Sequence, residues 1–290
     1  MMNCKICNSQ NLHVYLDNPT IFECGDCKIS FRPSNHQMKD IYSIKIPMPD
    51  FFASRIRNWH HINFIENNIG FKNIKSILEI GSGDGSLIRQ IRDNYENLEI
   101  TIIEPGTFFC DKLSKVVNIT IINDYIENVN RLNKNYDLII MSHVLEHLED
   151  PKKTLQLIFD NFLNKNNYLY IDIPNKDYEL RSVQAARVAP STHLFFFDGI
   201  GIKNLMADIG FKNISGNKYS TLPVGFINRL EKIGNIENNS MHHKLILKVL
   251  NRFSLYTSEL LTTIFKRNPP DIKLEDTDFK FNNIAIIAKK

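Results

Sequence analysis

The sequence contains no long hydrophobic run. No apolar stretch approaches the roughly 20 residues that a membrane-spanning helix needs. The first ten residues, MMNCKICNSQ, also lack the basic region followed by an apolar core that marks a secretion signal. We therefore expect a cytoplasmic protein without a transmembrane segment.

An excess of one charge is missing too. The chain has 35 Lys and Arg against 32 Asp and Glu, a formal net charge of +3, and its basic residues are scattered rather than gathered in a stripe. This distribution gives no support to a nucleic-acid partner, but it is compatible with a small anionic substrate. Internal repeats and low-complexity segments are absent as well. With 290 residues, 43% of them hydrophobic, the chain can bury a sizeable core and carry a smaller unit beside it.

Four of the five cysteines form two C-x2-C pairs with sixteen residues between them. Two such turns can bring four thiolates onto one tetrahedral Zn²⁺, and a site closed by four sulfurs leaves no position for water. The pattern therefore predicts a structural zinc in a small zinc-ribbon-like module over residues 1–34, with two redox pairs as the alternative. The predicted ligands are Cys4, Cys7, Cys24 and Cys27.

A glycine loop follows the short apolar stretch 77–80. In SILEIGSGDGSLIRQI the loop glycines stand at 81, 83 and 85, and an apolar-periodic helix begins directly after them, as in the first βα turn of a dinucleotide-type fold. Glu79 precedes the loop, where a pyrophosphate would be repelled. An adenosine cofactor with an amino-acid tail fits better, because the carboxylate can meet its ammonium and the helix N-terminus can meet its carboxylate.

Two further strand ends carry acidic residues. LEITIIEPG ends in Glu104, about twenty residues after the glycines, at the usual offset of the acidic residue that accepts the ribose hydroxyls. NITIIND ends in Asp124, which is placed to meet the adenine edge.

Four motifs in order, EIGSGDG, IIEPG, YDLIIMSHVLEHLEDP and YLYIDIPN, resemble class I S-adenosylmethionine (SAM)-dependent methyltransferases over roughly residues 75–215 and the final strand. The resemblance implies an α/β, Rossmann-like fold with a seven-stranded sheet. Its implied cofactor site comprises Glu79, Gly81, Ser82, Gly83, Gly85, Glu104, Pro105, Asp124, Tyr125, Ser142 and His143. The core would span 35–223, with a leading linker and helix in 35–74, a helical cap or insertion in 224–275 and the last strand in 276–290.

HVLEH, residues 143–147, has the H-x-x-E-H spacing of inverted zinc peptidases. Such a site needs an uninterrupted helix, yet Pro151 inside one would cost about 3 kcal/mol. Asp150 followed by Pro151 is instead a good helix start. We therefore predict that HVLEH lies in a loop at the cofactor pocket.

A metal at this loop is a second possibility. Some small-molecule and RNA O-methyltransferases that the chain resembles hold a divalent ion with E-x-x-E-H. Here His143 takes the place of the first Glu, but a set of His143, Glu146 and His147 is still able to bind a metal such as Mg²⁺ or Mn²⁺.

STHLFFFD resembles the EHxxYF stretch of zinc-knuckle sugar C-methyltransferases, which also begin with a CxxC...CxxC unit. His193 falls on the base of that family, whereas Ser191 and Thr192 replace its Tyr and Glu. We therefore prefer O-methylation, with C-methylation of a sugar nucleotide as the alternative. The predicted catalytic residues are His193 and His143. Arg181 and Arg187 flank the loop and could hold a phosphate or carboxylate.

The expected acceptor is a small anionic carbohydrate-type metabolite, phosphorylated or nucleotide-linked, of surface polysaccharide or secondary metabolism. Residues 241–265 are apolar with spaced basic residues, so they could pack as a cap, form a dimer face or contact a membrane surface. The oligomeric state stays open. A more remote alternative is a zinc knuckle that binds RNA or protein without catalysis.

Overall fold

The computed structural model describes residues 2–16, 18–33, 51–116, 118–129, 132, 134–181, 192–219, 274 and 281–290. The linker from residue 34 to 50, the segment with Arg187 and Ser191, and the predicted cap except Leu274 lie outside these ranges. In the part of the chain that the structure describes, no helix combines the length and the apolar character needed to span a bilayer.

A seven-stranded sheet forms the centre of the molecule, in the order β10-β11-β8-β7-β4-β5-β6. The strands are β4 (Ser76–Ile80), β5 (Glu99–Ile103), β6 (Ile119–Ile122), β7 (Tyr136–Ser142), β8 (Leu163–Pro174), β10 (Lys212–Tyr219) and β11 (Asn283–Lys289). Strands β4 to β8 are parallel, whereas β11 runs antiparallel to both β8 and β10. The predicted α/β fold with a seven-stranded sheet is confirmed.

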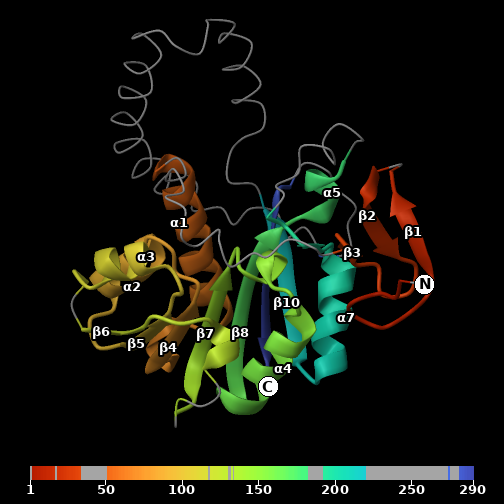
Figure 1. The fold of residues 1–290 in the computed structure, drawn as a ribbon. Helices are drawn as coiled ribbons and strands as arrows, with labels where there is room; N and C mark the ends of the chain where they lie inside the picture. The colour runs from red at the N-terminus through yellow and green to blue at the C-terminus, as the bar shows by residue number, and fades with distance from the viewer. Residues whose placement is uncertain are drawn as a thin grey trace, which may run out of the picture.

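Helices cover both faces of this sheet because successive strand side chains point to opposite faces. Ile77 packs in one apolar cluster with α1 (Phe51–Asn68), α2 (Ser86–Asn94) and α3 (Thr107–Leu113). Leu78 packs in the other cluster with α4 (Pro151–Asn161) and α7 (Gly199–Ile209). In Figure 1, α4 and α7 stand together on one side of the sheet and α1 stands on the other.

The N-terminal residues form a small antiparallel sheet that continues into the core. Its strands are β1 (Leu12–Tyr15), β2 (Asn18–Cys24), β3 (Ser30–Phe31) and β9 (Phe195–Phe196), in that order. Strand β9 comes from a segment more than 160 residues later in the chain, and Ile29 and Phe31 are buried in the same apolar cluster as Leu194. Figure 1 shows β1, β2 and β3 beside α7. The first 33 residues therefore share both a sheet and a hydrophobic core with the rest of the chain.

The HVLEH segment lies in a loop, as the sequence predicts. Strand β7 ends at Ser142, the single 3-10 turn η4 spans Leu145–His147, and α4 starts at Pro151. The Asp150 side chain caps α4 by accepting from the Lys153 backbone N–H at 2.9 Å. Because no helix carries both histidines, this loop cannot form the helical zinc site of the inverted peptidases.

Candidate active site

A cavity of about 230 Å³ opens where β4, β5 and β7 end. This is the carboxyl edge of the parallel strands, where open α/β sheets bind ligands. Seven of the predicted site residues line it: Gly81, Gly83, Glu104, Pro105, Tyr125, His143 and His147. Sequence reasoning missed Phe109, Ile126 and Glu127, which lie outside the quoted motifs, and Val144 and Leu148, which lie inside YDLIIMSHVLEHLEDP but were given no role.

The glycine loop needs its glycines for two reasons. Gly81 has φ +71°, a left-handed conformation, and a Cβ there would stand 2.5 Å from Val144 Cγ2. Gly85 also has φ +71°, and a Cβ on it would collide with Leu113. With these residues the loop turns tightly into α2 and leaves the helix N-terminus open to the cavity.

Glu104 fixes the end of β5 to this loop. Its Oε2 accepts from the Gly83 backbone N–H at 2.9 Å and its Oε1 accepts from that of Gly106 at 2.8 Å. Burial raises the pKa of Glu104, and the two N–H donors oppose that rise. Since a carboxylate oxygen can accept more than one hydrogen bond, both oxygens keep capacity for ribose hydroxyls.

Glu79 is a buried carboxyl whose surroundings favour its protonated form. Burial, together with the charges of Glu104 and Asp84, raises its pKa to about 8. Its Oε2 is buried and has no hydrogen-bond partner among the described residues, and the same holds for Ser82 Oγ. A cation brought beside Glu79 would stabilise its ionised form.

Glu79, Ser82, Gly85, Glu146 and His193 are not among the lining residues, and three further predicted residues lie outside the lining as well. Asp124 folds back onto its own turn, accepting from the Tyr125 N–H at 2.8 Å and the Asn128 amide at 2.7 Å. Ser142 is not a lining residue either. Arg181 is exposed, with its guanidinium 4.4 Å from the centre of the Tyr178 ring. The structure therefore does not bring these three to the cavity, and Arg187 is outside the described residues.

His143 lines the cavity with its ring held between two carboxylates. Its Nε2 is 3.2 Å from Asp172 Oδ2, and its Nδ1 is 3.4 Å from Glu146 Oε1. Burial lowers the pKa of His143, but the contacts with Asp172 and Glu146 outweigh it and raise that pKa to about 9. At neutral pH the ring is therefore a cation whose two nitrogens both face acceptors, so it cannot take a proton from a substrate.

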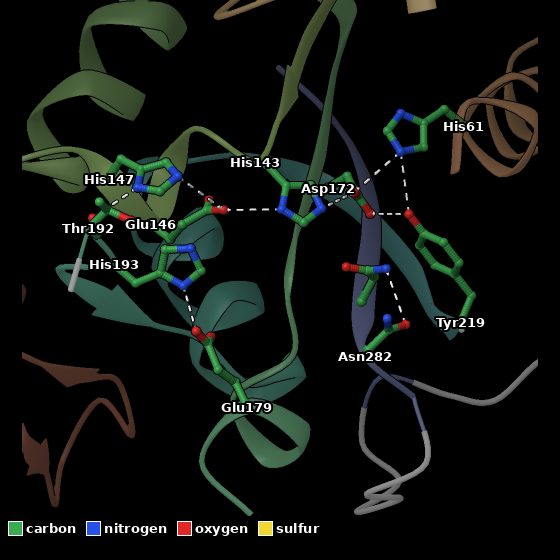
Figure 2. A network of polar contacts seen from close by, with 11 residues as sticks. His61, His143, Glu146, His147, Asp172, Glu179, Thr192, His193, Tyr219 and Asn282 are labelled. Atoms are coloured by element: carbon green, nitrogen blue, oxygen red, sulfur yellow. Dashed lines mark hydrogen bonds and ion pairs between the residues drawn. The ribbon is translucent and has the colours of Figure 1, made fainter. Parts of the chain in front are cut away.

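Asp172 connects His143 to a buried polar chain behind the cavity (Figure 2). The Tyr219 hydroxyl donates to its Oδ1 at 2.8 Å, and His61 Nε2 lies 3.3 Å from its Oδ2. Burial raises the pKa of Asp172, but the two histidines more than reverse this, and the net pKa is below the usual range. Sequence reasoning missed Asp172, although a single carboxylate within the apolar strand LYIDIP was the available signal.

Two histidines face each other on the far side of Glu146 (Figure 2). His193 Nδ1 is 2.6 Å from Glu179 Oε1, and His147 Nδ1 is 2.9 Å from the Thr192 carbonyl oxygen. The ring centres lie 4.9 Å apart in an edge-to-face arrangement. Because an acceptor stands at each Nδ1, the neutral form of each ring carries its proton there and presents the lone pair of Nε2.

The residues that could hold a metal include two of the three predicted ones. Glu146, His147 and His193 each offer a ligand atom, and these atoms lie within 4.8 Å of one another. Among the described residues, His143 joins no such group, because its ring faces Asp172 instead. Both carboxylate oxygens of Glu146 are buried and lack a hydrogen bond in the described part of the structure. The correction therefore replaces His143 by His193.

The four cysteine sulfurs of the N-terminal module also lie together. Cys4 Sγ is 3.6 Å from Cys27 Sγ, Cys7 Sγ is 3.5 Å from Cys24 Sγ, and all four ligand atoms fall within 4.8 Å of one another. Tetrahedral zinc with bonds of about 2.3 Å places its sulfurs about 3.8 Å apart. The donor set therefore fits a zinc ion in both chemistry and spacing.

Sequence comparison decides the family. A model of the methyltransferase domain matches residues 53–215, which is more than half of the chain. The chain belongs to the methyltransferase-domain family. The glycine loop and Glu104 of this methyltransferase domain lie at the edge of the sheet where open α/β folds bind their ligands.

Solved structures share its fold. A SAM-dependent methyltransferase from Archaeoglobus fulgidus is 19% identical, with a TM-score of 0.51, over 82% of this chain and 98% of the other. Phosphoethanolamine N-methyltransferase 2 from Haemonchus contortus, in complex with SAM, is 16% identical, with a TM-score of 0.58, over 90% of this chain and 61% of the other. The plantazolicin methyltransferase BpumL is 16% identical, with a TM-score of 0.53, over 89% and 91%. A search of curated proteins gives no match.

Proposed function

We propose that this methyltransferase transfers a methyl group to a hydroxyl oxygen of a small anionic carbohydrate-type acceptor in surface polysaccharide or secondary metabolism. The observation that carries O-methylation is the contact of 2.6 Å between His193 Nδ1 and Glu179, which makes a carboxylate-supported imidazole beside the cavity. The carbohydrate class rests on the resemblance of STHLFFFD and the cysteine pairs to zinc-knuckle sugar methyltransferases. We place the enzyme in the cytoplasm.

In this proposal the cofactor side uses the edge of β4, β5 and β6. Glu104 accepts the ribose hydroxyls, Tyr125 of the cavity lining meets the adenine in place of the predicted Asp124, and Glu79 meets the ammonium of the methionine tail. The raised pKa of Glu79, caused by burial and its acidic neighbours, supports a cationic ligand beside it. The backbone N–H groups at the start of α2 face the tail carboxylate.

The reaction requires little beyond alignment and one proton transfer. SAM supplies a methyl group already activated by its sulfonium. The acceptor oxygen forms a bond to the methyl carbon while the carbon–sulfur bond breaks, and the electron pair stays on sulfur. His193 Nε2 removes the hydroxyl proton, and the Nδ1–H donated to Glu179 stabilises the resulting imidazolium.

We also propose one structural Zn²⁺ on Cys4, Cys7, Cys24 and Cys27. The sulfur–sulfur distances of 3.5 and 3.6 Å support this ligand set. A closed four-sulfur site has no position for a substrate, so this zinc would hold the fold of the module.

A second candidate is metal-assisted O-methylation. It is favoured by the grouping of Glu146, His147 and His193 and by the buried carboxylate of Glu146, which lacks a hydrogen bond among the described residues. A bound Mg²⁺ or Mn²⁺ would lower the pKa of the acceptor hydroxyl, and His193 would then be a ligand rather than a base. Turnover that a chelator abolishes and Mn²⁺ restores would decide for the metal; turnover unaffected by the chelator would decide for the His193 base.

A methyl-transfer screen tests the acceptor class. The enzyme is incubated with SAM and a panel of sugar nucleotides and sugar phosphates, and S-adenosylhomocysteine (SAH) formation is measured. NMR of the product then separates an oxygen-bound from a carbon-bound methyl group, which distinguishes O-methylation from C-methylation of a sugar nucleotide. A panel without turnover, together with turnover on amines or peptides, would contradict the carbohydrate proposal. If titration calorimetry detected no SAH binding, a role of the zinc knuckle in RNA or protein recognition would be favoured instead.

A further inference from the structure

We propose that the N-terminal module, residues 2–33, belongs to the acceptor site because it positions His193, with Arg32 and Lys176 as positioning residues. The inference rests on the proposed function only in assigning His193 to the acceptor. The module would then be required to place His193 correctly for methyl transfer, as well as for the stability of the fold.

Backbone pairing joins the module to the segment that carries His193. Strand β3 pairs with β9, with Ser30 opposite Phe196, and the Arg32 N–H donates to the Leu194 carbonyl at 2.9 Å. The Leu194 N–H donates in turn to the Glu146 carbonyl at 2.8 Å. The residue next to His193 is therefore held on one side by the module and on the other by the HVLEH loop.

The Arg32 side chain reaches His193 itself. Its Nε donates to the His193 carbonyl oxygen at 3.1 Å, and its guanidinium lies 5.4 Å from the centre of the Phe196 ring. Its Nη1 donates to Thr20 Oγ1 of β2 at 3.3 Å. One side chain thus connects β2, the backbone of His193 and the start of β9.

The cysteine turn fixes the carboxylate partner of His193 as well. Lys28 directly follows Cys27, and its carbonyl accepts from the Nζ of Lys176 at 2.7 Å. Lys176 is buried and pairs with Asp198 at 2.7 Å. Lys176 begins the short helix α5 (Lys176–Glu179), whose last residue, Glu179, contacts His193.

The module therefore contacts His193 directly and contacts Lys176, the first residue of the helix that carries Glu179. Glu179 lies at the end of α5, and His193 lies two residues before β9. No single element therefore keeps their side chains 2.6 Å apart. A misplacement of about 1 Å can lower a rate by as much as 100-fold. Zinc on the cysteine turn would stabilise this arrangement by holding the Lys28 carbonyl in place.

The test uses the full chain labelled with ¹³C at histidine Cε1. The His193 cross-peak is assigned by its loss in His193→Gln, and it is followed in Arg32→Ala, Arg32→Lys and Lys176→Met. Val14→Ala is the matched control, because Val14 is 50% exposed on β1, at the edge of the module sheet farthest from β9. SAH affinity is measured by titration calorimetry for each variant.

We expect the His193 cross-peak to shift in Arg32→Ala and Lys176→Met, to shift less in Arg32→Lys, and to stay in place in Val14→Ala. The His61 cross-peak and SAH affinity should stay unchanged in all four. Zinc removal with a chelator should move the His193 cross-peak in the same direction as Arg32→Ala. With any acceptor found by the screen, Arg32→Ala should lower kcat on the order of 10- to 100-fold.

An unchanged His193 cross-peak in both Arg32→Ala and Lys176→Met would overturn the inference. So would equal shifts of His61 and His193, because these would indicate general destabilisation. The cross-peak reports where His193 lies whether or not His193 takes part in the chemistry. If Arg32→Ala shifts the cross-peak and His193→Ala leaves turnover unchanged, the positioning stands and the proposed base is wrong.

Discussion

The cofactor side of the cavity is built mainly from backbone, whereas the acceptor side is built from side chains of distant segments. On the cofactor side, Glu104 accepts from Gly83 and Gly106, 21 and 2 residues away in the chain. On the acceptor side, His193 reaches back to Glu179, its carbonyl meets Arg32 161 residues earlier, and its ring faces His147.

This difference predicts which side of the cavity is more sensitive to mutation. Backbone amides at the end of a parallel sheet stay in place as long as the sheet forms, because the ladder hydrogen bonds fix them. Side chains that meet from several elements depend on every one of those elements. We therefore expect mutations to separate the halves, with acceptor-side changes acting on turnover and cofactor-side changes acting on binding.

The largest expected effect is on the acceptor side. His193→Ala should lower kcat on the order of 10² to 10⁴, or about 3 to 5 kcal/mol of barrier, because the base acts in the transition state. SAH affinity, measured by titration calorimetry, should remain that of the native enzyme. Unchanged single-turnover rates, in which product release cannot mask the chemistry, would remove His193 from the mechanism.

The zinc module should show the next largest effect. Freshly purified protein should contain about one Zn²⁺ per chain, and Cys24→Ser should lower the free energy of unfolding by about 2 to 4 kcal/mol, since loss of a metal is among the strongly destabilising changes. Metal analysis and thermal unfolding measure both quantities. Protein that remains folded should still bind SAH, because the four sulfurs lie in the module and not in the cavity lining. Absence of zinc in the fresh protein would contradict this assignment.

On the cofactor side, Glu104→Ala should weaken SAH binding by about 1 to 3 kcal/mol, the cost of leaving two ribose hydroxyls without a charged acceptor. Titration calorimetry measures it directly. The neighbouring cavity residue Glu127 provides the control, because Glu127→Ala removes a carboxylate that is not expected to meet the ribose. Equal losses in the two variants would show that Glu104 has no special role.

The smallest expected effect is the release of a proton from Glu79 when SAH binds. Because burial, Glu104 and Asp84 raise the pKa of Glu79 to about 8, this carboxyl is about nine-tenths protonated at pH 7. An ammonium beside it should ionise it, so SAH binding at pH 7 should release close to one proton. Calorimetry in buffers of different ionisation enthalpy measures this release.

Glu79→Gln should abolish the proton release, and a binding enthalpy independent of the buffer in the native enzyme would contradict the proposed pairing. The free energy of unfolding should also depend on the ionisation of Glu79. A carboxyl whose pKa rises from 4.5 to about 8 on folding contributes stability below about pH 4.5 that is lost as the pH rises through 8. Glu79→Gln should therefore flatten this part of the pH profile of the cofactor-free protein.

Local patterns predicted the strands, the glycine loop, the cap at Asp150 and the grouping of the cysteines, because each depends on neighbours in the chain. They could not predict the metal-capable set. HVLEH places His143 three residues and His147 one residue from Glu146, and both rings lie near its carboxylate, at 3.4 and 3.8 Å. His143 has φ +54° and its Nε2 faces Asp172 on β8, so the third member of the group with Glu146 and His147 is His193, which the fold brings in from a distant segment.

The sequence by itself determined the α/β sheet and the edge at which the cavity opens, because strand periodicity, glycine spacing and the offset to Glu104 are local properties of consecutive βα units. Only the tertiary structure decided that β3 pairs with β9, that Asp172 bridges His143 and His61, and that Arg32 meets His193. These contacts join segments separated by long stretches of chain. Their partners are chosen by which buried surfaces and polar groups satisfy one another once the core has formed, and no spacing in the sequence encodes that choice.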